Sequence, residues 1–161
     1  MATTKLLKIY LQDHEGLSYA TSELIRRVRS KNGEEPLAGF LDRIAETTRR
    51  DRAALIGLME RYGVRPNGLK RRVLWLGEKL GRLKLNGRIV NYSPLSRLYE
   101  LESLTLVVTM KVSLWQSLRA ELAGDGRLEG AHPDELLEQA ERDLEALAGH
   151  RTAAAARAFG D

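Results

Sequence analysis

The sequence of 161 residues contains no cysteine. This absence excludes disulfide bonds, cysteine-ligated zinc, iron–sulfur clusters and thiol catalysis. The N-terminus lacks the apolar run and small-residue cleavage site of a secretory signal. No apolar stretch approaches the ~20 residues that a membrane-spanning helix needs. We therefore expect a cytoplasmic protein without a membrane span.

Proline is scarce, with only 4 in the chain, and strand-like alternation of apolar and polar residues is nowhere sustained. Ala, Leu, Arg and Glu are abundant, and all four residue types favour helix. These features predict an all-α protein, and the length suits one domain. The net charge of +4 indicates no more than a weak attraction to anions.

Capping residues and the spacing of apolar residues predict five helices. The clearest start is at Ser93 and Pro94, which suit the N-cap and the first position of a helix. The predicted helices cover residues 4–31, 36–62, 66–86, 94–122 and 134–158.

Short loops after the first and second helices force antiparallel neighbours. The simplest fold is therefore an up-down-up-down four-helix bundle with an additional C-terminal helix. The bundle would occupy residues 1–123, a Gly-rich linker 124–133 and the appended helix 134–161, as a single domain overall.

The helix predicted at 94–122 is apolar on almost every side in its middle. A helix of this kind is buried all round, so it is central, or shared with the last helix or with a partner subunit. We expect a homodimer through this helix or the last one. The apolar residues are Leu104, Leu106, Val107, Val108, Met110, Val112, Leu114 and Trp115.

Two polar residues interrupt apolar heptad stripes. His14 lies in the stripe of the first helix and Asp51 in that of the second, so both side chains should be buried. Counting from the turns places His14 and Asp51 at about the same level of the bundle, close to Glu102 and Glu78. Carboxylates and imidazole in one layer suit iron, manganese or zinc.

The same layer has a second interpretation, as a buried hydrogen-bonded network that fixes the packing register. Di-metal sites in ferritin-like bundles use Glu-x-x-His on two helices. Here that spacing occurs only at Glu129 and His132, in the predicted linker. The structural interpretation is therefore favoured over a metal site.

Several short segments carry a resemblance to a known family. They are Asp13-His14, Arg50-Asp51-Arg52, residues 78–88, and Tyr92-Ser93-Pro94-Leu95-Ser96-Arg97-Leu98 followed by Glu100-Leu101-Glu102. Over residues 6–122 the chain resembles a family of uncharacterised bacterial ferritin-like bundle proteins. The resemblance implies a ferritin-like fold and no particular activity.

Residues 65–88 form a basic segment in which Glu78 is the only acid. Such a segment could contact nucleic-acid phosphates or an anionic membrane surface. The simpler interpretation is a solvated helix face that pairs with acidic residues of the last helix, since the motifs of nucleic-acid-binding modules are absent. The candidate anion-binding residues are Lys70, Arg71, Arg72, Arg82, Lys84 and Arg88.

No catalytic residue is predicted, because no serine has a histidine at a recognisable motif spacing and no phosphate-binding glycine motif occurs. The sequence favours a non-enzymatic structural or interaction protein. A metal-binding bundle and an anion-surface binder remain as alternatives.

Overall fold

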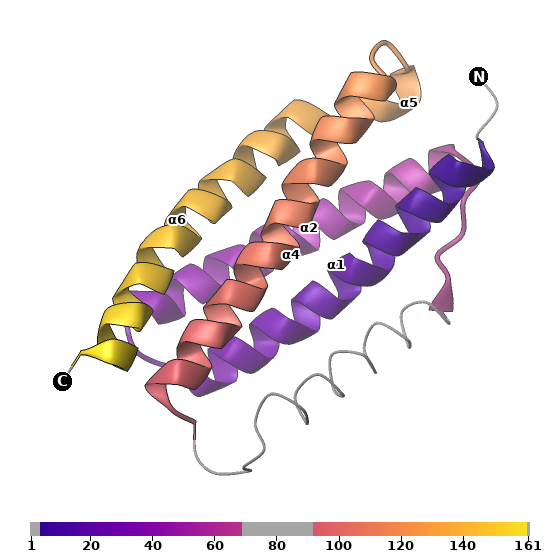
Figure 1. The fold of residues 1–161 in the computed structure, drawn as a ribbon. Helices are drawn as coiled ribbons and strands as arrows, with labels where there is room; N and C mark the ends of the chain where they lie inside the picture. The colour runs from indigo at the N-terminus through magenta and orange to yellow at the C-terminus, as the bar shows by residue number, and fades with distance from the viewer. Residues whose placement is uncertain (1–3, 69–91, 161) are drawn as a thin grey trace.

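The computed structural model describes residues 4–68 and 92–160 (Figure 1). These residues form helices and no strand, which confirms the all-α prediction for the described part of the chain. The helices are α1 (Lys5–Lys31), α2 (Leu37–Arg61), α4 (Pro94–Glu121), α5 (Gly126–Glu129) and α6 (Pro133–Phe159). No described helix is both long and apolar enough to span a bilayer.

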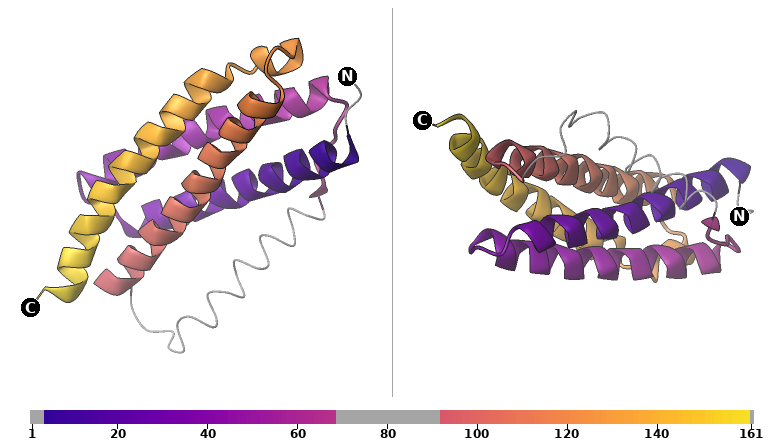
Figure 2. Two further views of the ribbon diagram at one scale, coloured as in Figure 1. Left: turned by 45° about the horizontal axis from the view of Figure 1, so that its top comes forward. Right: turned by 90° about the horizontal axis from the view of Figure 1, so that it is seen from below.

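Four long helices lie side by side. α1 packs against α2 and α4, and α6 packs against α4 and α2. Each of these neighbouring pairs is antiparallel, whereas α2 and α4 run in the same direction (Figures 1 and 2). The short helix α5 lies against α2. The C-terminal helix, predicted as an appended element, is therefore a full side of the bundle.

The connection from α2 to α4 decides this topology. α2 ends where α1 begins, and α4 begins at the opposite end of the bundle (Figure 1). The parallel direction of α2 and α4 follows from the positions of these two ends. The predicted third helix, at 66–86, falls almost entirely in residues 69–91, outside the described residues.

The helix ends follow local sequence signals. Ser93 and Ser96 form a capping box at the start of α4, and Pro94 occupies the first turn, as predicted. Gly63 has φ 64° just after α2, a conformation that favours glycine over residues with a Cβ atom. The predicted linker at 124–133 contains α5, whose first turn is capped by the Asp125 side chain.

The core consists of two apolar clusters. The cluster at the α5 end includes Leu11, Leu55, Leu58, Met59, Trp115, Leu118, Leu128 and Leu137. The cluster at the opposite end includes Ile25, Val28, Phe40, Leu41, Ile44, Leu101, Leu104 and Leu147. Between these two groups, α1, α2 and α6 carry buried polar side chains and α4 carries the mostly buried Lys111, so a polar layer divides the core.

Candidate functional site: the buried polar layer

A lysine joins two aspartates at the centre of the polar layer. Lys111 Nζ lies 2.6 Å from Asp51 Oδ2 and 3.5 Å from Asp143 Oδ2. The three side chains are 13%, 6% and 8% exposed. The lysine comes from α4, and the carboxylates come from α2 and α6. This ion-paired cluster thus connects three of the four long helices.

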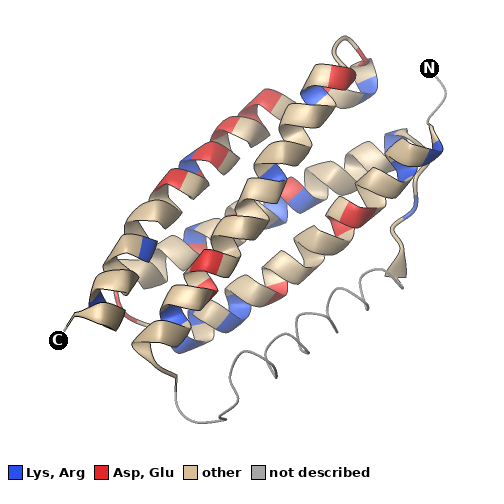
Figure 3. Ribbon diagram, in the orientation of Figure 1, with Lys and Arg blue, Asp and Glu red and all other residues tan. Residues whose placement is uncertain are grey.

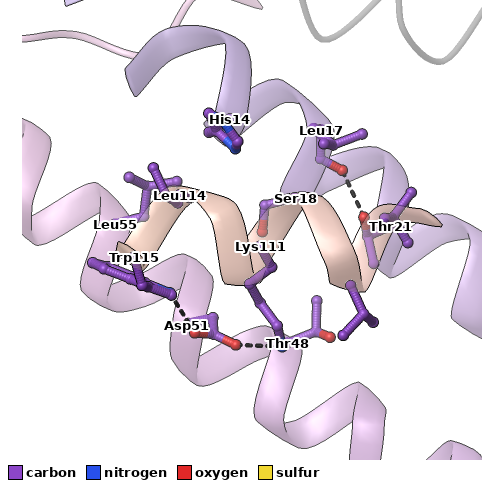
Figure 4. A pocket seen from close by; sticks show the side chains of 12 residues that line it. His14, Leu17, Ser18, Thr21, Thr48, Asp51, Leu55, Lys111, Leu114 and Trp115 are labelled. Atoms are coloured by element: carbon purple, nitrogen blue, oxygen red, sulfur yellow. Dashed lines mark hydrogen bonds and ion pairs between the residues drawn. The ribbon is translucent and has the colours of Figure 1, made fainter. Parts of the chain in front are cut away.

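Both carboxylates also accept hydrogen bonds from neighbouring side chains. Trp115 Nε1 donates to Asp51 Oδ1 over 3.1 Å, as Figure 4 shows. Thr47 Oγ1 donates to Asp143 Oδ2 over 2.8 Å, and Gln139 Nε2 donates to Asp143 Oδ1 over 3.0 Å. Each carboxylate oxygen therefore has a donor or a cation beside it, which is what a buried charge requires.

Helical spacing explains how the layer is assembled. The pairs Thr47 and Asp51, Lys111 and Trp115, and Gln139 and Asp143 are each four residues apart, so each pair shares one helix face. One helix supplies each pair. The three inward faces meet at the same level because their helices pack against one another.

Burial dominates the electrostatics of Asp51. Burial raises the pKa of this carboxyl above its ordinary value, because removal from water disfavours the charged form. The Lys111 ammonium and the hydrogen bond from Trp115 oppose that rise in pKa, and the nearby charge of Asp143 adds to it.

His14 approaches the layer from α1. Its side chain is buried, and its ring meets the Tyr10 ring edge-on with centroids 4.5 Å apart. Burial lowers the pKa of His14, while the charge of Asp13 acts in the opposite direction. His14 and Asp51 line the same cavity, as predicted from their levels, but the partners of Asp51 are Lys111 and Trp115 (Figure 4).

Two cavities flank Asp51. The first has a volume of about 30 Å³, is also lined by His14, and has room for about one or two water molecules. The second, between α2 and α6, has a volume of about 330 Å³ and is lined by side chains of both charges, including Arg50, Glu135 and Arg142. The mixed lining of the larger cavity favours neither an anionic nor a cationic ligand.

A second buried ion pair lies between α1 and α2. Glu15 is fully buried, and Arg52 Nη2 lies 3.0 Å from its Oε1. The guanidinium of Arg52 also lies over the Tyr19 ring, 5.4 Å from its centroid. This pair therefore ties the first two helices together beside the polar layer.

The predicted metal ligands are not all brought together. His14 and Asp51 are buried and line one cavity, but Glu102 is exposed on α4, because it points to the face opposite Leu101 and Leu104. Glu78 lies outside the described residues. Within the described ranges no three His, Asp or Glu side chains are placed to hold a metal ion. Iron, manganese or zinc thus has no matching donor set in this part of the chain.

The predicted anion-binding residues also lie outside the described residues: Lys70, Arg71, Arg72, Arg82, Lys84 and Arg88. The acids of α6 that were expected to pair with them are partly engaged elsewhere. Asp143 points inward to Lys111, and Glu138 lies 3.6 Å from Arg142 on the same helix. Figure 3 shows acidic residues gathered along α6.

Sequence reasoning missed the central residue of the layer. Lys111 is the only charged residue between Leu104 and Leu118, and a lone lysine in an apolar helix was the available signal. Asp143 had a similar signal, since it lies three residues after Ala140 and four before Leu147 in an inward stripe.

Comparison of the chain with protein-family models, with curated proteins and with solved structures gives no match. The geometry of the polar layer and of the bundle surface is therefore what indicates a function.

Proposed function

We propose that this protein is a non-enzymatic helical bundle that acts through interactions, and that its polar layer fixes how the helices pack. The observation that supports this proposal is the closed pairing of the buried charges. Lys111 forms ion pairs with both Asp51 and Asp143. The remaining hydrogen-bond donors to the two carboxylates are Trp115, Thr47 and Gln139.

A closed network of this kind suits a structural role. A shift of α4 by one helical turn would move Lys111 about 5.4 Å and leave the buried charges unpaired. An uncompensated buried charge costs about 3–5 kcal/mol, so the network disfavours alternative registers. The small cavity beside the layer admits only about one or two water molecules, and the larger cavity of about 330 Å³ has a lining of mixed charge that indicates no particular substrate.

We also propose that the bundle has a ferritin-like arrangement of helices. Ferritin-like bundles contain one long crossover connection, in contrast to up-down-up-down bundles with short loops. The long connection between α2 and α4 and the parallel direction of these two helices support this assignment (Figure 2). An experimental structure with a different helix order would contradict it.

Metal binding is not supported by the described residues. A cation at Asp51 would lie next to the Lys111 ammonium, which is only 2.6 Å from the carboxylate. Repulsion between the two positive charges opposes such a site. The anion-binding alternative stays a prediction, because its residues lie outside the described residues.

The test removes the charges of the layer and keeps its shape. The triple variant Asp51→Asn, Lys111→Met and Asp143→Asn keeps one amide oxygen at position 51, as an acceptor for Trp115, and one at position 143, as an acceptor for either Thr47 or Gln139. We expect it to stay folded, within about 2 kcal/mol of the wild type, because a buried ion pair is often replaceable by neutral groups. Circular dichroism and urea unfolding measure this.

The triple variant should also replace the wild-type gene in cells without a phenotype, since the proposal gives the charges no chemical task. Deletion of the gene serves as the reference phenotype. A variant that is folded and stable but behaves in cells like the deletion would show that the layer performs chemistry, and the proposal would be wrong.

A further inference from the structure

Four large apolar side chains are exposed on α4. Leu95 is 40% exposed, Tyr99 49%, Leu106 70% and Met110 46%. Their spacing of four, seven and four residues places them on one helix face. We call these four residues the α4 stripe. The opposite face of the helix carries buried Leu101, Leu104 and Val108, so the stripe points away from the core.

Packing among the described helices does not account for the stripe. α4 contacts α1 and α6 through its other sides. Single exposed apolar residues are ordinary, but an aligned set on one face marks an interaction surface. The ribbon of α4 is mostly uncharged, in contrast to α6 (Figure 3). The stripe thus suits an apolar partner.

The spacing of the stripe is symmetric. The midpoint between Leu95 and Met110 falls between residues 102 and 103, and so does the midpoint between Tyr99 and Leu106. If two copies of α4 cross antiparallel at this point, Leu95 meets Met110 of the other copy and Tyr99 meets Leu106. Each apolar residue then faces an apolar residue, which is the self-complementarity that a two-fold interface requires.

We propose that the α4 stripe binds a second copy of this chain, in an antiparallel two-fold dimer centred between Glu102 and Ser103. The inference rests on the proposal that the protein acts through interactions and names the partner. The charge pattern agrees, because Lys111, the only charged residue between Ser103 and Leu118, points inward. Glu102 is three residues after Tyr99 and four before Leu106, so this exposed carboxylate lies on the face of the stripe near the two-fold axis, and the contact must leave its charge in water.

The size of the stripe sets the strength of the dimer. From Leu95 to Met110 the helix rises about 22 Å, and a helix is about 10–12 Å wide. The contact is therefore about 250 Å² per copy, well below the roughly 800 Å² per partner of a standard specific interface. We expect a reversible dimer that forms in the micromolar range or above.

Sedimentation velocity of the full chain across a concentration series tests the dimer. Leu106→Glu should raise the dissociation constant at least about tenfold, because each dimer loses two apolar contacts and gains two charges. Leu6→Glu is the matched control, since Leu6 is 76% exposed on α1, away from the stripe. The control should dimerise like the wild type.

Single cysteines test the antiparallel register, and the natural chain adds no thiol background. Ser103→Cys places both thiols next to the two-fold axis, so oxidation should form a covalent dimer. Leu95→Cys places them roughly 22 Å apart along the helix axes, too far for a disulfide. Equal cross-linking of both variants would indicate a parallel pairing and would overturn the proposal.

Other occupants of the stripe give different results. If residues 69–91 of the same chain cover it, the protein stays monomeric and Leu106→Glu lowers its melting temperature. If a different protein binds there, the chain stays monomeric and Leu106→Glu leaves the melting temperature unchanged. Either result overturns the dimer. Neither affects the proposed role of the polar layer, which the uncharged triple variant tests separately.

Discussion

Lys111 of α4 and Asp51 of α2 form the shortest contact of the buried layer, with Nζ 2.6 Å from Oδ2. Their helices occupy diagonal corners of the bundle, so the pair crosses its centre. From this position we expect that removing either side chain alone is costly.

Loss of the lysine alone should be strongly destabilising. Lys111→Met leaves Asp51 and Asp143 buried without a cation, and we expect the free energy of unfolding to fall by about 3–5 kcal/mol. Urea unfolding measures the change. Lys31→Met, at an exposed position, is the control and should shift stability by less than about 0.5 kcal/mol. Similar values for the two variants would show that Lys111 is not held in the layer.

Asp51 should give the protein a specific pH dependence. Its folded pKa is raised above the unfolded value, so the native state binds a proton first as the pH falls. The contribution of Asp51 to stability is therefore present below the unfolded pKa and lost as the pH rises through the folded pKa.

We expect the stability of the wild type relative to Asp51→Asn to increase on acidification from neutral pH towards the ordinary aspartate pKa of 3.8. Urea unfolding of both proteins across this pH range measures the difference. A difference that decreases on acidification would mean that the Lys111 pair outweighs burial.

His14 should make the stability of the protein depend on pH in the opposite sense to Asp51. Its folded pKa is lowered from 6.5 by burial, so the neutral ring is favoured in the native state. The stability that it contributes is present above the unfolded pKa and lost as the pH falls through the folded pKa.

NMR titration of the imidazole signals should show His14 changing protonation below pH 6.5. In addition, His14→Gln should remove the corresponding part of the acid sensitivity of unfolding. A His14 signal that titrates at or above the ordinary value would contradict the buried position on α1.

Two leucines of α4 test which face of the helix is inside. Leu101 has no exposed surface, so Leu101→Ala should cost about 2–5 kcal/mol. Leu106 is 70% exposed, so Leu106→Ala should change the stability of the monomer by less than about 0.5 kcal/mol. The measurement is chemical unfolding at a concentration below dimer formation. Equal losses of stability in the two variants would show that α4 is rotated differently about its own axis.

Metal content separates the two interpretations of the layer. Protein expressed with iron, manganese and zinc should contain no stoichiometric metal by mass spectrometry, because Lys111 occupies the side of Asp51 where a cation would bind. Asp51→Ala is the comparison. Near-stoichiometric metal in the wild type that disappears in Asp51→Ala would establish a metal site and contradict the structural interpretation.

Local features of this chain could be predicted well from the sequence. Ser93 and Pro94 start α4 because a side-chain acceptor and a missing N–H suit the first turn of a helix wherever it lies. The burial of His14 and Asp51 followed from their places in apolar stripes, since a heptad stripe faces the core regardless of which helix covers it.

The partners of those residues could not be predicted in the same way. Asp51 was matched with His14 by counting across turns, a procedure that carries an error of about one helical turn at each step. That error is enough to replace one partner by another. The third and last step placed Glu102 in the layer, although its side chain is exposed. Lys111 was missed because its helix was treated as uniformly apolar.

The sequence by itself determined that the described part of the chain is helical, where its long helices begin and end, and which stripes of α1 and α2 are buried, because these properties depend on residues a few positions apart. It did not determine which side of α4 is buried, since Leu106 and Met110 were expected inside and are exposed. Only the tertiary structure decided that α6 is a side of the bundle and that Asp51, Lys111 and Asp143 meet. These contacts join residues 60 and 32 positions apart along the chain. They depend on how whole helices rotate and slide against each other, which is set by the packing of all four at once.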